Sequence, residues 1–359
     1  MFVISNRGTR EKLSLERSEK SSTTYIRTLQ AEWPVYKISS VGRNDMETNM
    51  KYKKIVLAGG NGYLGKVLTK YYNDKAAEIV ILSRHEKRQE GHVRTVVWDG
   101  KTAGRWTAEL VNADVLINLC GKNVNCRYTD KNKAEIFRSR LDPTEILGQV
   151  IRDLYEPPKL WINLSSATIY RHAEDRPQDE ETGEHGEGFS VDVCEAWEYA
   201  FNKYDTPKTR KIALRMGIVL GRSDSVFPRL LNLVKMGMGG QQGNGQQYVS
   251  WVHELDAARC TEWFADHPEL EGIFNCTAME PVKNNELMRI IRKAEGCPIG
   301  LPAPKWLLEI GSVFIRTETE LILKSRWVLP KRLLESGFTF TYPEAEGAIK
   351  NIITDYKGD

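Results

Sequence analysis

The sequence predicts an α/β protein built on a doubly wound parallel sheet. Three observations predict it: short apolar segments recur between residues 54 and 216, helical segments separate them, and a glycine-rich turn follows the first strand. Short apolar strands that alternate with helices are typical of parallel sheets buried on both faces. The carboxyl ends of such strands meet along one edge, where ligands bind.

The composition allows a full apolar core and excludes several classes of partner. The 359 residues include 51 basic and 48 acidic side chains, and a net charge of +3 gives no strong attraction to nucleic acid or to a membrane surface. The longest apolar runs are shorter than a membrane span. The six cysteines show neither paired nor metal-ligand spacing. We therefore expect free thiols, no metal site and a cytoplasmic protein. We also expect a monomer or homodimer with a small-molecule substrate, which the composition does not itself determine.

The chain divides into three parts by composition. Residues 1–50 are rich in Ser, Thr and mixed charge without a sustained period, which predicts a disordered extension, or translated sequence upstream of a start at Met46 or Met50. Residues 51–222 form the predicted dinucleotide-binding domain. Residues 223–359 form a smaller α/β substrate lobe with a family-specific C-terminal segment, which can also contribute one strand to the sheet.

The elements are expected in a regular order. Strands are predicted at 54–58, 78–82, 94–98, 114–119, 160–164 and 212–216, and helices at 63–73, 130–154 and 189–204. Beyond residue 221 the rhythm changes. There we expect a Gly- and Gln-rich loop at 236–253, a helix at 255–266, a strand at 272–276, a helix at 284–295, and a helical tail that includes 301–314 and 329–338.

The glycine-rich turn has the architecture of a dinucleotide-binding turn. Ile55, Val56 and Leu57 form the preceding strand, and the glycines are spaced one residue wider than in GxGxxG. A glycine triplet alone is a weak signal, but strand, turn and helix occur here in the required order. Glycines allow the backbone to approach a pyrophosphate, and the helix N-terminus favours its charge. The predicted contacts are Gly59, Gly60, Asn61, Gly62, Tyr63, Leu64 and Gly65.

The end of the second strand indicates the cofactor. An NAD-binding strand usually ends in a carboxylate that binds the ribose hydroxyls, whereas this one ends in Ser83 and Arg84. A hydroxyl and a guanidinium suit a 2′-phosphate, so NADP(H) is favoured over NAD(H). The alternative is that Arg84 is one more solvated cation. Asp99, after the third strand, is either an acceptor for the adenine amine or a turn residue.

The chain resembles the extended short-chain dehydrogenase/reductase superfamily, and more narrowly its atypical branch, the epimerase family proteins of the SDR39U1 type. The resemblance covers about residues 53–354 and implies a Rossmann-like fold. It also implies an NAD(P)-dependent epimerase or oxidoreductase that acts on a small polar substrate, with a nucleotide sugar as one candidate. The motifs that carry it are GGNGYLG (59–65), LSR (82–84), VWDG (97–100), NLCG (118–121), KAEIFRSRLDPTEIL (133–147), SSATIY (165–170), WE (197–198), LRMGIVLGR (214–222), GNGQQYVSWVHELD (243–256) and VLPKRLLESGFTFTYPE (328–344).

The same resemblance implies further cofactor contacts. Leu119, Cys120 and Gly121 would line the cofactor, and Glu135 and Arg140 would bind its ribose and phosphate. From the residues alone, Glu135 and Arg140 lie five positions apart and do not share one tight helical face. A salt bridge between them is therefore a poor alternative.

The expected catalytic residues are incomplete. The superfamily uses a Ser or Thr to polarise a carbonyl, and a Tyr that a Lys four residues later activates. Ser166 matches the serine, although its hydroxyl could simply satisfy a strand end. Counting back from Glu198 places Cys194 and Ser190 where the Lys and Tyr should stand. Tyr170 is the nearest phenol and a candidate proton donor. Members of this branch commonly lack the Tyr-Lys pair, and the alternative function is a catalytically silent NADP(H)-binding sensor or interaction protein.

The resemblance also places a substrate-binding cluster in the Gly- and Gln-rich segment, at Gln246, Trp251 and His253. His253 is either a proton carrier near neutral pH or a residue that caps or braces a loop. Asp256, near the start of a predicted helix, is interpreted as a contact to the helix N-terminus.

Overall fold

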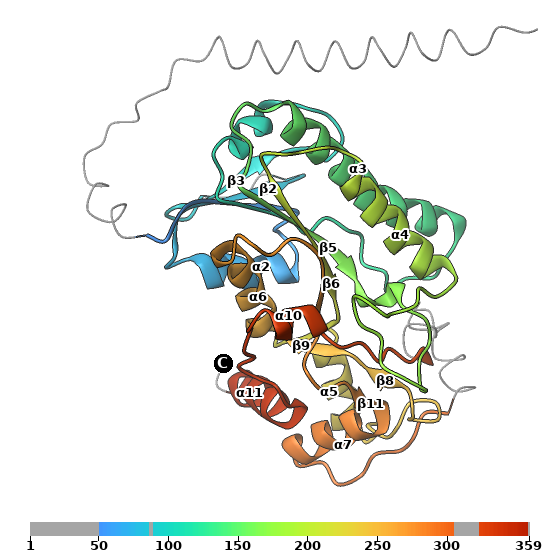
Figure 1. Ribbon diagram of the computed structural model, residues 1–359. Helices are drawn as coiled ribbons and strands as arrows, with labels where there is room; N and C mark the ends of the chain where they lie inside the picture. The colour runs from blue at the N-terminus through green and yellow to red at the C-terminus, as the bar shows by residue number, and fades with distance from the viewer. Residues whose placement is uncertain (1–49, 86–88, 305–322, 358–359) are drawn as a thin grey trace, which may run out of the picture.

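A seven-stranded parallel sheet forms the centre of the protein (Figure 1). The computed structural model describes residues 50–85, 89–304 and 323–357. The strand order is β10-β6-β5-β4-β1-β2-β3, with every pair parallel. The chain runs outward from β1 to β3 and then returns to β4, so the order reverses beside β1. The strands are β1 (Tyr52–Ala58), β2 (Ala76–Ser83), β3 (Val93–Val97), β4 (Val115–Asn118), β5 (Leu160–Ser166), β6 (Arg210–Met216) and β10 (Gly272–Cys276).

Helices cover both faces of this sheet, because successive strand residues point to opposite sides. Ile55 and Leu57 of β1 pack in a core with α2 (Tyr63–Tyr72) and α6 (Glu254–Asp266). Val56 and Ala58 pack in a second core with α3 (Asp130–Asp153) and α4 (Phe189–Asn202). Figure 1 shows the two helix pairs on opposite sides of the strands. The predicted doubly wound α/β fold is confirmed.

A smaller lobe lies below the sheet in Figure 1 and has its own apolar core. Side chains from three helices and from a pair of short parallel strands form this core. The elements of the lobe are β7 (Ile218–Leu220), α5 (Phe227–Lys235), β8 (Tyr248–Val249), β9 (Trp251–His253), β11 (Val282–Lys283), α7 (Asn284–Glu295) and α11 (Ala345–Lys357). A short helix, α10 (Lys331–Glu335), packs against β10 in the core of the central sheet. Two short 3₁₀ helices, η2 (Arg105–Leu110) and η3 (Ala167–Ile169), belong to the sheet domain.

The lobe differs from the sequence expectation in three places. The predicted loop at 236–253 is wrong over its last residues, because β8 and β9 pair there with β11 and β7. Helices α5 and α11 were not predicted. Of the predicted helical tail, α10 lies within 329–338, whereas 305–314 falls outside the described residues, as do residues 1–49.

No helix in the described parts of the chain is long and apolar enough to cross a membrane. No group of three or more His, Cys, Asp or Glu side chains in the same ranges could hold a metal ion.

Candidate cofactor and active site

The glycine-rich turn lies at the carboxyl end of β1 and leaves no room for side chains. Gly59 has a φ of +77°, and a Cβ there would lie 2.9 Å from the Cys120 Sγ. A Cβ on Gly65 would lie 2.1 Å from the carbonyl oxygen of Gly60. Gly62 begins α2 and provides no side-chain cap. The first N–H groups of α2 are therefore available to an oxyanion at a turn into which a pyrophosphate can approach closely.

Tyr63 and Leu64 can contribute to this turn through their backbone only. The Tyr63 hydroxyl donates a hydrogen bond to Glu254 at the start of α6. Leu64 packs against the core beneath α2. Both side chains therefore point toward protein and hold the helix in place.

The end of β4 closes the turn from the other side. Leu119 donates its backbone N–H to the Ala58 carbonyl at 2.8 Å, which brings Cys120 against Gly59. Burial raises the pKa of the Cys120 thiol to about 12, although the charge of Arg84 acts in the opposite direction. This thiol is therefore uncharged at neutral pH and serves as an apolar wall.

The end of β2 holds Ser83 and Arg84 beside the same turn. The buried Ser83 hydroxyl accepts hydrogen bonds from the Asn61 side chain and, at 3.3 Å, from the His85 backbone N–H. Ser83 thereby fixes Asn61 of the glycine turn. Arg84 is exposed, lies close enough to Cys120 to affect its pKa, and forms no ion pair with any residue that the structure describes. Its guanidinium is available to a ligand at this edge.

Asp99 is engaged in its own turn. Its carboxylate accepts hydrogen bonds from the Lys101 and Thr102 backbone N–H groups at 2.8 and 2.9 Å. The Thr102 hydroxyl adds a third bond at 2.7 Å. Burial would raise the pKa of Asp99, but these hydrogen bonds outweigh it and lower the pKa. The geometry fits the turn residue, and a contact of Asp99 with adenine stays a prediction.

Ser166 lies at the carboxyl end of β5 and lines a cavity of about 100 Å³. Its Oγ accepts hydrogen bonds from the Thr168 backbone N–H at 3.3 Å and from the Thr168 hydroxyl at 3.0 Å. Because both bonds are accepted, the Ser166 proton remains available to a substrate oxygen. The complete lining is Val124, Tyr128, Ile136, Arg140, Ser166, Thr168, Phe189, Ser190, Val193, Cys194 and Trp197.

Ser190 and Cys194, which stand in the positions expected for the Tyr-Lys pair, both line this cavity. The Cys194 Sγ lies 3.4 Å from the Thr168 hydroxyl. Burial raises the pKa of Cys194, although this hydrogen bond acts in the opposite direction. The thiol therefore stays protonated and does not replace a lysine.

Tyr170 is a core residue that does not line this cavity, and its role as a proton donor stays a prediction. The side chain is fully buried, and burial raises its pKa. Its hydroxyl donates to Asn275 at 3.0 Å and accepts from Arg215 at 2.9 Å. Arg215 in turn forms a buried ion pair with Glu198 at 2.8 Å. Sequence proximity to Ser166 does not reveal this, because the partners come from β6 and β10.

None of the three residues of the predicted substrate cluster lines the Ser166 cavity. Trp251 is fully buried and donates its indole N–H to the Glu280 carbonyl at 3.2 Å. His253 is buried and caps α6, accepting the Leu255 backbone N–H at Nδ1, which fits the bracing alternative. Gln246 is exposed and binds Lys283 at 2.9 Å. These residues belong to the lobe and its surface, and their contact with a substrate stays a prediction.

Asp256 was interpreted as a contact to the helix N-terminus, and its carboxylate also binds backbone N–H groups of a distant segment. It is fully buried and accepts the Thr341 and Tyr342 backbone N–H groups at 2.8 Å each. It therefore fastens the segment before α11 to α6.

Glu135 and Arg140 both bind the segment that follows β4. Glu135 forms an ion pair with Lys122. Arg140 Nη1 donates to the carbonyls of Lys122 at 3.2 Å and Ile136 at 3.1 Å. A Cβ on Gly121 would lie 3.2 Å from the Arg140 guanidinium carbon. Lys122 was not predicted as a residue of this site, although its position directly after the NLCG motif could have indicated it.

A buried network of amide and hydroxyl side chains, which was not predicted from the sequence, supports the carboxyl ends of the strands. Asn118, the last residue of β4, donates to Thr144 at 2.9 Å and to Asn163 at 2.7 Å. Its own amide oxygen accepts the Cys120 backbone N–H at 3.1 Å. The end of β4 and the middle of β5 are thereby tied to α3, and the network holds Cys120 against the glycine turn.

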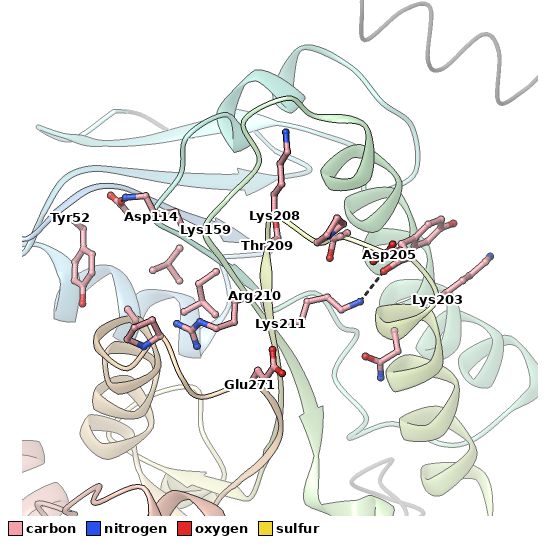
Figure 2. Close-up of a pocket in the computed structure, with 18 of the residues that line it drawn as sticks. Tyr52, Asp114, Lys159, Lys203, Asp205, Lys208, Thr209, Arg210, Lys211 and Glu271 are labelled. Atoms are coloured by element: carbon pink, nitrogen blue, oxygen red, sulfur yellow. Dashed lines mark hydrogen bonds and ion pairs between the residues drawn. The ribbon is translucent and has the colours of Figure 1, made fainter.

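A larger cavity, of about 1010 Å³, lies at the opposite edge of the sheet. Figure 2 shows Asp114, Lys159 and Arg210, at the amino ends of β4, β5 and β6, among its lining residues. Lys159 pairs with Asp114 at 2.7 Å. Because the glycine turn lies at the carboxyl ends, this cavity is not the dinucleotide edge.

The fold and the glycine turn at its switch point define the class of Rossmann-like dinucleotide-binding proteins. Within this class, the chain belongs to the NAD dependent epimerase/dehydratase family, whose model matches residues 55–277. A second model, "Domain of unknown function (DUF1731)", matches residues 303–352.

Relatives agree with this assignment. The epimerase family protein YfhF of Bacillus subtilis is 31% identical, over 84% of this chain and 99% of its own. The human epimerase family protein SDR39U1 is 27% identical, over 84% of this chain and 99% of its own. A crystal structure of human SDR39U1 (isoform2) with NADPH matches with a TM-score of 0.75 over 84% of this chain and 99% of that one. The resemblance stated from the sequence is confirmed.

Proposed function

We propose that this protein is an NADP(H)-dependent, epimerase-like oxidoreductase of a small polar substrate, with a nucleotide sugar as one candidate. The observation that carries the proposal is the glycine turn, where a Cβ at residue 65 would lie 2.1 Å from backbone. Such a closed turn at the carboxyl end of β1 suits a pyrophosphate. The relative crystallised with NADPH supports the choice of cofactor.

The residues of this edge fit the cofactor. The backbone of residues 59–65 would hold the pyrophosphate, Ser83 and Arg84 the 2′-phosphate, and residues 119–121 the ribose. The nicotinamide would supply or accept a hydride. We further propose that residues 51–222 form the cofactor-binding domain and that residues 223–359 complete the substrate side.

Ser166 would orient the substrate. Thr168 donates to the Ser166 Oγ at 3.0 Å, which directs the serine proton toward the cavity. A substrate carbonyl or alcohol oxygen would accept this proton in a hydrogen bond, which stabilises negative charge that develops on that oxygen.

The test is NADPH oxidation and NADP⁺ reduction with a panel of small carbonyl and hydroxyl compounds and nucleotide sugars. Ser166→Ala should lower kcat/KM about 100-fold and leave NADPH affinity unchanged. Ser223→Ala, at an exposed serine, is the matched control. If no compound in the panel is turned over, the proposal that this protein is an enzyme is contradicted.

A second candidate function is that of a catalytically silent NADP(H)-binding protein, which acts as a sensor or an interaction protein. Ser190 and Cys194 in the positions of the Tyr-Lys pair favour it. NADPH binding without turnover, together with a Ser166→Ala variant that keeps every cellular function, would support this reading.

A further inference from the structure

Arg140 has an unusual set of partners. A guanidinium carries five N–H donors. Both Nη1 hydrogens are used, by the carbonyls of Lys122 and Ile136. The structure gives the Nε and Nη2 groups no hydrogen-bond partner among the residues it describes, and these two groups form the fork that grips a carboxylate side-on.

The guanidinium is held in a fixed orientation. Its carbon lies 5.1 Å from the Trp197 ring centroid, and Gly121 lies close enough that a Cβ there would be 3.2 Å from the same carbon. Burial lowers the pKa of Arg140. The Arg140 side chain is only partly exposed, so its charge is partly removed from water and favours an anionic partner.

The cavity that Arg140 lines provides no such anion. None of the described residues that line it is acidic, and most are aromatic or aliphatic. Its volume of about 100 Å³ leaves room for a group of carboxylate size.

We propose that this cavity binds the carboxylate of a small substrate, with Arg140 as its partner and the reacting carbon beside Ser166. The inference rests on the proposed function and narrows its small polar substrate to an organic acid. The carboxylate would accept from Nε and Nη2, while the substrate's carbonyl or hydroxyl oxygen accepts from Ser166. Trp197, Phe189 and Val193 would exclude water from the pair.

A cofactor phosphate is an oxyanion as well, and the resemblance assigned Arg140 to ribose and phosphate. The cavity favours the substrate, because it includes Ser166 and no residue of 59–65 or 119–121. The substrate and the cofactor thus use different groups along the same sheet edge.

The test is calorimetric titration of the NADPH-loaded full-length protein with sodium oxamate, which joins a carboxylate to an amide carbonyl. Oxamide, its neutral analogue, is the control ligand. Oxamate should bind at least about tenfold more tightly than oxamide, because only the charged ligand pairs with the fork. This comparison uses the unaltered protein and does not depend on how a variant folds.

Arg140→Lys keeps the charge but loses the fork. It should weaken oxamate binding about tenfold or more and change NADPH affinity less than about threefold. Arg138→Lys, at an exposed arginine of the same helix, should change neither. Equal affinity for oxamate and oxamide, or no binding of either, would overturn the proposal. Loss of NADPH binding in Arg140→Lys with oxamate binding intact would also overturn it and assign Arg140 to the cofactor.

If the proposed function itself is wrong, the titrations give a different result from those above. In that case the unaltered protein does not bind NADPH, yet oxamate titration of the cofactor-free protein still reports on the Arg140 cavity.

Discussion

Gly65 packs directly on Gly60: a Cβ on Gly65 would lie 2.1 Å from the Gly60 carbonyl oxygen and 2.5 Å from its Cα. This contact joins the first turn of α2 to the end of β1, and no flexible side chain can move aside to relieve it. The close approach explains why a helix can start so near the strand, with its N–H groups directed at the turn.

Gly65→Ala should therefore damage both stability and binding. Overpacking of this kind costs about 1–3 kcal/mol in the free energy of unfolding. Displacing the start of α2 should also weaken NADPH binding. Urea unfolding and NADPH titration measure the two effects.

Gly347→Ala is the matched control. Gly347 lies in α11, and a Cβ added there would meet nothing within 4 Å. The substitution should stabilise the protein by about 0.5–1 kcal/mol, because alanine favours a helix, and leave NADPH binding unchanged. Equal effects of the two substitutions would contradict the packing argument.

Tyr170→Phe separates a structural from a catalytic role. The variant removes the buried hydroxyl that binds Arg215 Nη1 and Asn275 Oδ1, which should lower the free energy of unfolding by about 1–3 kcal/mol. The exposed Tyr199 provides the control Tyr199→Phe, which should be neutral. Once the variant is folded, its kcat should equal that of the unaltered protein. A selective loss of kcat in Tyr170→Phe would restore the tyrosine as a proton donor.

His253 should make the protein less stable in mild acid. Burial lowers the pKa of His253 below its ordinary value of about 6.5, despite the opposing charges of Glu254 and Asp256. The unfolded chain therefore binds the proton more tightly, so the stability present above about pH 6.5 is lost as the pH falls. His253→Asn keeps an acceptor for the Leu255 N–H and should flatten this dependence. Unfolding measured between pH 5 and 8 tests it, with His85→Gln at an exposed histidine as the control.

The sheet could be predicted from the sequence because its strands are short and apolar. Residues such as Val56 and Leu57 are buried on both faces and therefore form continuous runs. Helix α11 carries apolar residues at helical spacing, including Ala345, Ala348 and Ile352, so its signal was present in the chain. The strands β8 and β9 follow a stretch of glycine and glutamine, whose composition predicts a loop.

The side chains around Ser166 were harder to predict, because their positions depend on long-range contacts. Tyr170 is separated from its partner Asn275 by 105 residues. Trp251 has the residue type of a binding pocket and also of a core, and only the packed lobe distinguishes the two. By contrast, the close contact between Gly60 and Gly65 is local and follows from the spacing of the glycines.

The central claim is that a nicotinamide dinucleotide with a 2′-phosphate binds beside Arg84. The most direct measurement is calorimetric titration of the unaltered protein and Arg84→Ala with NADPH and with NADH. Arg289→Ala, at an exposed arginine of α7, is the control. NADPH should bind about 10- to 100-fold more tightly than NADH, and Arg84→Ala should abolish this preference while retaining NADH affinity. Binding of neither nucleotide, or an unchanged preference in Arg84→Ala, would contradict the account.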